Sequence, residues 1–122
     1  MLDAGAFLAF DKGDARVRAY LAAARRLGVD LVTTSPVVAQ VWRNGRRQAL
    51  LARLLSATRV EPPDESAARR AGELLAKTRT ADVVDAMVAG LARDDDRILT
   101  SDPDDLRALL TAARVHAVVI AI

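Results

Sequence analysis

Short apolar runs alternate with longer amphipathic segments along this chain. Strands are expected at the apolar runs, over residues 2–3, 31–33, 58–60, 98–100 and 117–122. Helices are expected between them, over residues 15–27, 35–43, 46–57, from 64 or 66 to 77, 81–93 and 103–114. Such alternation predicts an α/β fold around a small, mostly parallel central sheet flanked by helices. We expect one domain over residues 1–122, with the wholly apolar last strand fully buried.

Polar residues and glycine mark where several of these helices begin and end. Asp14 suits the N-cap of helix 15–27, and Gly28 suits its C-terminal stop. Ser35 followed by proline is the pattern of an N-cap ahead of a first-turn proline. Thr80 is expected to cap helix 81–93.

The composition excludes several kinds of site. The chain has 122 residues, 52% of them hydrophobic, with no cysteine and one histidine, His116. A disulfide framework, a zinc–thiolate site and a cysteine nucleophile are excluded, and a Ser-His-Asp triad is disfavoured. Because no apolar run is long enough to span a membrane and no signal peptide opens the chain, we expect a cytoplasmic protein without a membrane partner.

The formal net charge of +2 conceals a bias within each sign. The 18 basic residues are 16 arginines and two lysines, and the 16 acidic residues are 13 aspartates and three glutamates. The excess of the shorter carboxylate makes the positions of the aspartates informative.

Several aspartates follow strands or begin helices. Asp3 ends the first strand and Asp102 follows strand 98–100, and ligands of open α/β sheets gather at the carboxyl ends of strands. Asp85 lies on a largely apolar helix, where an unpaired charge needs a reason. We expect Asp3, Asp85 and Asp102 to converge on a metal ion, with secondary acids at the rim, namely Asp82 and either Asp104 or Asp105. Ligands that are all oxygen favour Mg²⁺ or Mn²⁺, which suit phosphoryl chemistry.

Simpler explanations exist for some of these residues. The helix dipole alone favours Asp82 at a helix start, and Asp102, just before a proline, also suits an N-cap. The acidic run 94–96 is expected to be a solvated turn, and His116 to be structural or exposed. Trp42 is expected to pack in the fold or an interface rather than to stack on a base.

Four stretches together resemble the PIN-domain ribonucleases, in particular the VapC toxins of bacterial toxin–antitoxin pairs. They are residues 2–6 (LDAGA), 34–41 (TSPVVAQV), 82–89 (DVVDAMVA) and 98–106 (ILTSDPDDL). Their order and spacing are those of the family across essentially the whole chain. The resemblance implies a PIN-like three-layer α/β sandwich, and an activity in which water activated by Mg²⁺ or Mn²⁺ hydrolyses RNA phosphodiesters.

The resemblance also assigns roles and shows two departures. Asp3, Asp85 and Asp102 take the catalytic and metal-binding positions, with Thr100 or Ser101 orienting a carboxylate or a water. Gln40 stands where the family usually has glutamate, which weakens metal binding or shifts the burden to the secondary acids. Only two residues precede Asp3, where the family usually has several strand residues, and so short a strand is expected to hold Asp3 less firmly.

Basic residues and the resemblance together point to partners. Arg43, Arg46 and Arg47 follow Gln40 closely and are expected to contact RNA phosphates, helped by basic residues 25–26, although they also suit solvated helix faces. The resemblance implies a cognate VapB-type antitoxin that covers a groove among the first helices. It also implies a homodimer.

The leading hypothesis is a metal-dependent endoribonuclease, the toxin component of a type II toxin–antitoxin pair. The alternative is a catalytically weak or inactive PIN-like module that binds RNA or antitoxin, a hypothesis that Gln40 and the short first strand support. A receiver-type phosphotransfer domain is disfavoured because it needs a lysine after its last full strand, and only Lys12 and Lys77 exist. A phosphatase with Asp-x-Asp after its first strand is disfavoured because Gly5 occupies the second acid's position.

Overall fold

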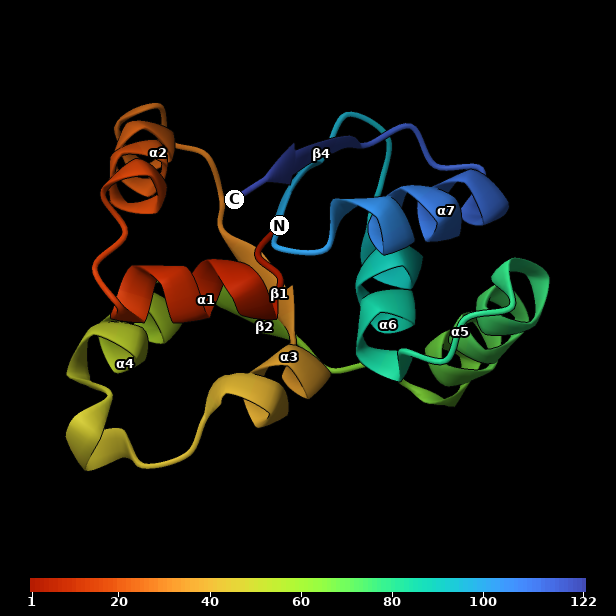
Figure 1. Cartoon of the computed structure of the whole chain (residues 1–122), viewed down its shortest axis with the longest axis horizontal. Coiled ribbons are helices and arrows are strands. Elements are labelled where there is room, and N and C mark those ends of the chain that lie inside the picture. The colour runs from red at the N-terminus through yellow and green to blue at the C-terminus, as the bar shows by residue number, and fades with distance from the viewer.

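The computed structural model describes residues 1–122 and contains seven α-helices, one 3₁₀ turn and four short strands (Figure 1). The helices are α1 (Ala4–Asp11), α2 (Ala15–Arg26), α3 (Ser35–Val41), α4 (Ala49–Ser56), α5 (Glu65–Thr78), α6 (Val83–Leu91) and α7 (Pro103–Ala113), with the 3₁₀ turn η1 (Gly45–Arg47) ahead of α4. The strands are β1 (Val32–Thr34), β2 (Arg59–Glu61), β3 (Arg97–Thr100) and β4 (Val118–Ala121). None of the helices combines the length and the apolar character that a membrane crossing requires.

The first three residues join two small parallel sheets. β1 pairs with β2, and β3 pairs with β4, both in parallel. Between the two pairs, Leu2 forms a parallel bridge with Leu99 of β3, and its amide donates to the carbonyl of Val32 in β1 at 2.8 Å. The hydroxyl of Thr33 also donates to the Leu2 carbonyl at 2.7 Å. The backbone order is therefore β2, β1, residues 1–3, β3 and β4.

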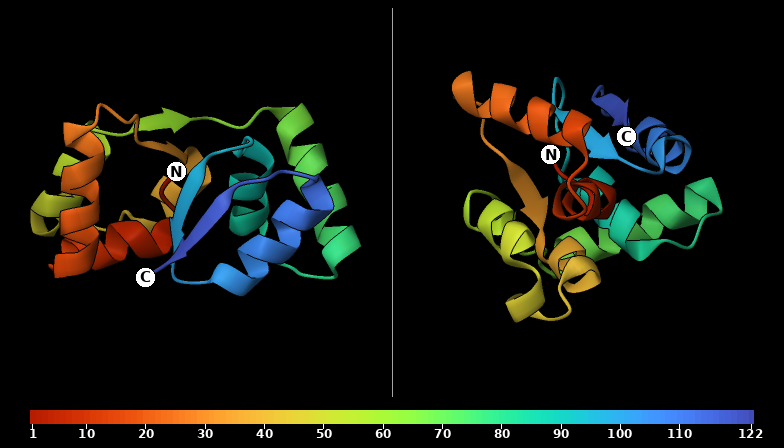
Figure 2. Two further views of the ribbon diagram at one scale, coloured as in Figure 1. Left: turned by 90° about the horizontal axis from the view of Figure 1, so that it is seen from above. Right: turned by 60° about the vertical axis from the view of Figure 1, so that its left-hand side comes forward.

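The helices form two sets, one on each side of these strands. In the first set α1 packs against α2, α3 and α4, and in the second set α5, α6 and α7 pack against one another. Figures 1 and 2 show the two sets on opposite sides of the strands. This arrangement confirms the predicted α/β fold with helices flanking a small parallel sheet.

A single cluster of 20 buried apolar residues holds the two sets together. Its largest fully buried side chains include Phe7, Leu51, Ile98 and Leu106, and burying a side chain of this size contributes about 1.5–3 kcal/mol. The mostly apolar α6 contacts α3, α5, α7 and β1. Asp85, in the first turn of α6, is therefore held at the edge of the core.

The predicted limits of α2 agree closely with the structure. The carboxylate of Asp14 accepts a hydrogen bond from the amide of Val17 at 3.0 Å, which satisfies a free donor of the first turn. Gly28 has a φ of +68°, a backbone conformation that glycine adopts at little cost just beyond a helix.

Three predicted helix boundaries are wrong. Asp82, not Thr80, caps α6, because its carboxylate accepts from the amides of the first turn, whereas the Thr80 hydroxyl pairs with that of Thr78. Helix 46–57 is divided into η1 and α4 at Gln48, whose φ and ψ of −124° and 44° are not helical. Thr34, not Ser35, occupies the N-cap position of α3.

The last strand is not fully buried as its apolar sequence suggests. β4 pairs only with β3 and has no neighbour on its other side, so it is the edge of the sheet. Its end residues Val118 and Ala121 are exposed. An apolar run marks a strand, but the run cannot distinguish a central strand from an edge strand.

Candidate metal centre

Six aspartates lie at the N-termini of α1, α6 and α7. Asp3 caps α1, Asp82 caps α6, and Asp102 occupies the N-cap position of α7. Asp85 lies in the first turn of α6, and Asp104 and Asp105 lie in the first turn of α7. The partial positive charge of each helix N-terminus partly offsets the repulsion among these acids.

Asp85, Asp102 and Asp105 come closest together. One carboxylate oxygen from each lies within 4.8 Å of one from each of the others. Asp85 is buried with 6% of its surface exposed, whereas Asp102 is exposed, so the cluster opens to solvent on one side. The Asp102 carboxylate accepts no capping hydrogen bond from the first turn of α7, so it is available to a ligand.

Asp3 is fixed beside this cluster by a chain of hydrogen bonds. Its Oδ1 accepts from the amide of Ala4 at 2.7 Å, and its Oδ2 accepts from the hydroxyl of Thr100 at 2.7 Å. The same Thr100 oxygen accepts from the amide of Asp102 at 3.0 Å. The expectation that Thr100 orients a carboxylate is therefore confirmed, and it links two of the predicted site acids. Asp3 is only 4% exposed, so the short first strand does not leave it loosely held.

The secondary acids differ in where they point. Asp82 is exposed, and its Oδ1 accepts from the amides of Val84 and Asp85 at 2.9 and 3.0 Å, so its other oxygen is free of protein partners. Asp104 is exposed and forms a salt bridge with Arg107 at 3.0 Å. Asp105, its neighbour in sequence, joins the cluster instead. Because successive helical residues are rotated by about 100°, only one of the two can face the cluster, and the sequence left that choice open.

Burial and mutual repulsion disfavour the charged form of the two innermost acids. Burial raises the pKa of Asp85 to about 7, and repulsion from Asp3, Asp82, Asp102 and Asp105 adds to this effect. Burial also raises the pKa of Asp3 above 3.8, although the hydrogen bonds from Thr100 and the Ala4 amide oppose it. A bound cation would reverse both effects, because it stabilises the carboxylates.

Gly5 allows the first turn of α1 to approach the loop that carries Asp102. A Cβ atom at Gly5 would lie 2.7 Å from the Cβ and 2.8 Å from the backbone nitrogen of Ser101. A backbone atom cannot move aside as the end of a side chain can. The glycine in LDAGA therefore has a steric role that the sequence alone does not reveal.

The remaining predicted residues lie around and beyond the cluster. Gln40 is exposed in the last turn of α3, a helix that packs against α1 and α6. Arg43 donates to the carbonyls of Ala39 and Trp42 at 3.0 and 2.8 Å, whereas Arg46 and Arg47 in η1 are exposed.

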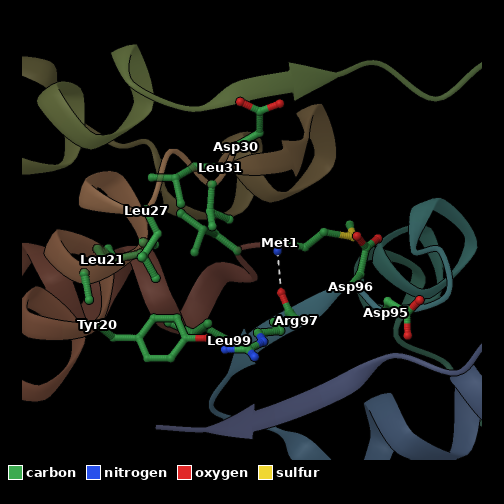
Figure 3. A pocket seen from close by; sticks show the side chains of 14 residues that line it. Met1, Tyr20, Leu21, Leu27, Asp30, Leu31, Asp95, Asp96, Arg97 and Leu99 are labelled. Carbon is green, nitrogen blue, oxygen red and sulfur yellow. Dashed lines mark hydrogen bonds between the residues drawn. The ribbon is translucent and has the colours of Figure 1, made fainter.

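Other predicted features lie at the amino ends of the strands. The run 94–96 forms the expected turn, where Asp94 accepts from the backbone amide of His116 and Asp96 accepts from that of Arg93. A pocket of about 420 Å³ beside this turn is lined mainly by apolar residues of α2 and the strand starts, including Leu21 and Leu99 (Figure 3). It contains none of the clustered acids.

A model of the family described as PIN domain matches residues 1–109, which include every acid of the cluster. A search of the curated proteins finds no match to this chain.

Proposed function

This chain belongs to the PIN-domain family, and on that premise we propose that it is a metal-dependent endoribonuclease, the toxin component of a type II toxin–antitoxin pair. The observation that carries the proposal is the cluster of Asp85, Asp102 and Asp105 within 4.8 Å in a chain of this family. Its substrate would be RNA, and its place of action the cytoplasm.

The donor set fits Mg²⁺ or Mn²⁺. Three carboxylates supply oxygen ligands only, the chemistry that hard divalent cations select. Burial holds the pKa of Asp85 near 7, so a neighbouring cation would stabilise the charged form of this acid the most. Asp85, Asp102 and Asp105 would hold the ion, and Asp3 and Asp82 add negative charge around it. When bound, the ion supplies an activated water and neutralises the charge that develops on the scissile phosphate.

The protein's own groups set the geometry of the reaction. Thr100 fixes Asp3 and the Asp102 amide through one hydroxyl, so two acids from distant parts of the chain keep a constant separation. In the hydrolysis a water oxygen forms a bond to phosphorus while the bond to the leaving ribose oxygen breaks, and that oxygen takes up a proton. Asp3, fixed by the Thr100 hydroxyl and the Ala4 amide, keeps a carboxylate at a defined position close to the reacting groups.

The test is cleavage of single-stranded RNA by the purified protein with Mg²⁺ or Mn²⁺. Asp85→Asn and Asp102→Asn are expected to abolish cleavage, and Asp105→Asn to weaken metal binding at least tenfold. Asp104→Asn is the matched control, because Asp104 lies in the same helical turn as Asp105 but pairs with Arg107 at the surface. If Asp104→Asn and Asp105→Asn lose the same metal affinity, the assignment of the cluster is contradicted.

Gln40 supports the second candidate, a catalytically weak or inactive module that binds RNA or antitoxin. An amide adds no charge to the site and is a poor base, so the Gln40→Glu variant should bind metal more tightly than the wild type. If the wild type does not cut RNA with either metal and Gln40→Glu does, the native chain is such a binding module.

An antitoxin of the VapB type is proposed as a partner. A groove of about 1230 Å³ runs between α2 and α4. Apolar side chains line it, including Phe10, Leu50 and Leu54, and four arginines surround it, namely Arg18, Arg25, Arg26 and Arg53. Because Asp30 is its only acid, an amphipathic helix with acidic flanks suits it. Calorimetric titration with the protein encoded by the adjacent gene tests this, and Arg25→Glu should weaken binding.

A homodimer is also part of the proposal. The free edge of β4 carries Val118, which is 55% exposed, and unpaired strand edges favour association. Sedimentation equilibrium gives the mass directly. Val118→Lys should shift a dimer towards the monomer, and a wild-type protein that is monomeric at all concentrations would refute this part.

A further inference from the structure

Trp42 presents an exposed aromatic ring next to α3. It is the only tryptophan of the chain, it follows the last residue of α3 directly, and it is 42% exposed. Its indole rests on Gly45, where an added Cβ would lie 2.7 Å from Cζ2 and 3.1 Å from Cη2. The ring is therefore supported by a residue without a side chain while much of its surface faces solvent.

The segment beneath the ring is held by its own hydrogen bonds. The Gln48 side chain accepts from the amides of Arg43 and Asn44 at 2.8 and 2.9 Å and donates to the carbonyl of Val41 at 2.9 Å. The Arg43 guanidinium donates to the carbonyl of Trp42 itself. A ring positioned in this way before a ligand arrives loses little conformational freedom on binding.

Positively charged residues follow the ring closely in the sequence. Arg46 and Arg47 are exposed in η1 and form none of the chain's three salt bridges. No acidic residue lies between Asp30 and Glu61 in the sequence. Trp42 is also the only large exposed apolar side chain between the start of α3 and the end of α4. An isolated ring among unpaired arginines suits a polyanion with exposed bases better than it suits an apolar protein surface.

The helix that precedes the ring, α3, packs against two helices that carry acids of the site. This helix follows β1 without a linker and packs against α1 and α6, the helices that begin at Asp3 and Asp82. In Figure 1 it lies beneath the start of α1 and beside the lower end of α6, where that helix begins. Gln40, one turn or less from Trp42, is exposed on the same helix.

We propose that Trp42, Arg46 and Arg47 form a platform that stacks one unpaired base of single-stranded RNA and holds the adjoining phosphates beside the metal centre. The proposal rests on the proposed ribonuclease function and adds to it the side chains that would contact the substrate strand. Bases in a duplex are stacked on one another and cannot reach the indole, whereas single-stranded segments can be splayed onto an aromatic ring.

The single tryptophan allows this contact to be observed directly. Asp85→Asn protein, which keeps Trp42 and is expected not to cut, is titrated with a single-stranded RNA 10-mer and with the same sequence in a duplex. The single strand should quench the indole fluorescence with a saturable curve, and the duplex should leave it nearly unchanged. A fluorescence change that instead follows protein dilution without RNA would assign Trp42 to a contact between protein chains and overturn the proposal.

Three variants separate stacking from structure. Trp42→Leu should raise the RNA dissociation constant about tenfold, and Trp42→Phe should recover most of that loss. Gly45→Ala keeps the ring but displaces it, so both quenching and affinity should fall. The double variant Arg46→Ala/Arg47→Ala should lower the dependence of log affinity on log salt by roughly 1.4. The matched control is Arg93→Ala, at the opposite end of α6 from Asp85, which should leave the salt dependence unchanged.

Cleavage kinetics distinguish failure of this proposal from failure of the ribonuclease function. The platform predicts that Trp42→Leu raises KM about tenfold and leaves kcat nearly unchanged. If the wild type cuts RNA and Trp42→Leu cuts it with the same KM, the platform is wrong and the nuclease stands. If RNA quenches Trp42 but the wild type does not cut, the platform stands and the nuclease function fails.

Discussion

Asp85→Asn should stabilise the metal-free protein above neutral pH while removing its response to metal. In the folded chain the pKa of Asp85 is about 7, against an ordinary value of 3.8. A group whose pKa is raised by folding stabilises the fold fully below its unfolded pKa, and that stability is lost as the pH rises through the folded pKa. Wild-type protein should therefore lose stability between about pH 4 and pH 7.

The size of the effect follows from the shift in pKa. At about 1.4 kcal/mol for each pH unit, the full difference corresponds to about 4 kcal/mol. Because Asp102 is exposed, water reaches one side of the cluster and screens the repulsion. We therefore expect the ionisation of Asp85 to lower the unfolding free energy of the wild type by about 2 kcal/mol. Because asparagine has nearly the same shape and no charge, Asp85→Asn should be more stable than the wild type by this amount at pH 8. At pH 4 the two proteins should have almost the same stability.

Urea denaturation in the presence of EDTA measures this change at both pH values. The control is Asp95→Asn, because Asp95 is exposed with a φ of +69°, which asparagine tolerates. The control should not alter the pH dependence. If Asp85→Asn is no more stable than wild type at pH 8, or if its advantage is the same at pH 4, the repulsion argued for this cluster is absent.

The other expected outcomes concern metal and two packing details of the site. Mn²⁺ at about 100 times its dissociation constant should raise the unfolding free energy of the wild type by about 2.7 kcal/mol in the same denaturation assay. It should leave the unfolding free energy of Asp85→Asn unchanged. Thr100→Val should lower the unfolding free energy by about 1–3 kcal/mol and reduce kcat, because it removes the hydroxyl that donates a hydrogen bond to Asp3. A kcat equal to that of the wild type would refute the positioning role of Thr100. Gly5→Ala should lose about 1–3 kcal/mol in thermal unfolding because its methyl group meets the Ser101 backbone. Gly72→Ala, in open space within α5, should instead gain about 0.5–1 kcal/mol, and a gain at Gly5 would contradict the steric role.

The sequence was sufficient to predict six of the seven α-helices and a cluster of acids next to the strands, but α1 was not among the expected helices. Polar caps such as Asp14 and acids next to strands such as Asp3 can be recognised from the residue type and its neighbours in the sequence. The choice between Asp104 and Asp105 depends on the rotation of α7 relative to α6, which is fixed by packing far away in the sequence. The cap at Asp82 rather than Thr80 likewise required the position of the preceding turn.

Two features gave no local signal. The exposed edge of β4 follows from the absence of a neighbouring strand, and an apolar sequence cannot report an absent neighbour. The contact of Gly5 with Ser101 joins residues 96 positions apart. A single glycine in an apolar segment does not show which distant part of the backbone packs against it.

The place of residues 1–3 between β1 and β3 has a consequence for synthesis on the ribosome. These residues are made well before their partners, because the strand partner of Leu2 and the hydroxyl that binds Asp3 belong to residues 97–100. At about 5–20 residues per second, roughly 5–20 s of translation separate the two. During that interval α1 carries Phe7 without the core that buries it in the finished chain, and contacts this distant in sequence form slowly. A nascent or prematurely ended chain that lacks residues 97–105 therefore has no assembled centre, and any nuclease activity begins only after those residues have been made.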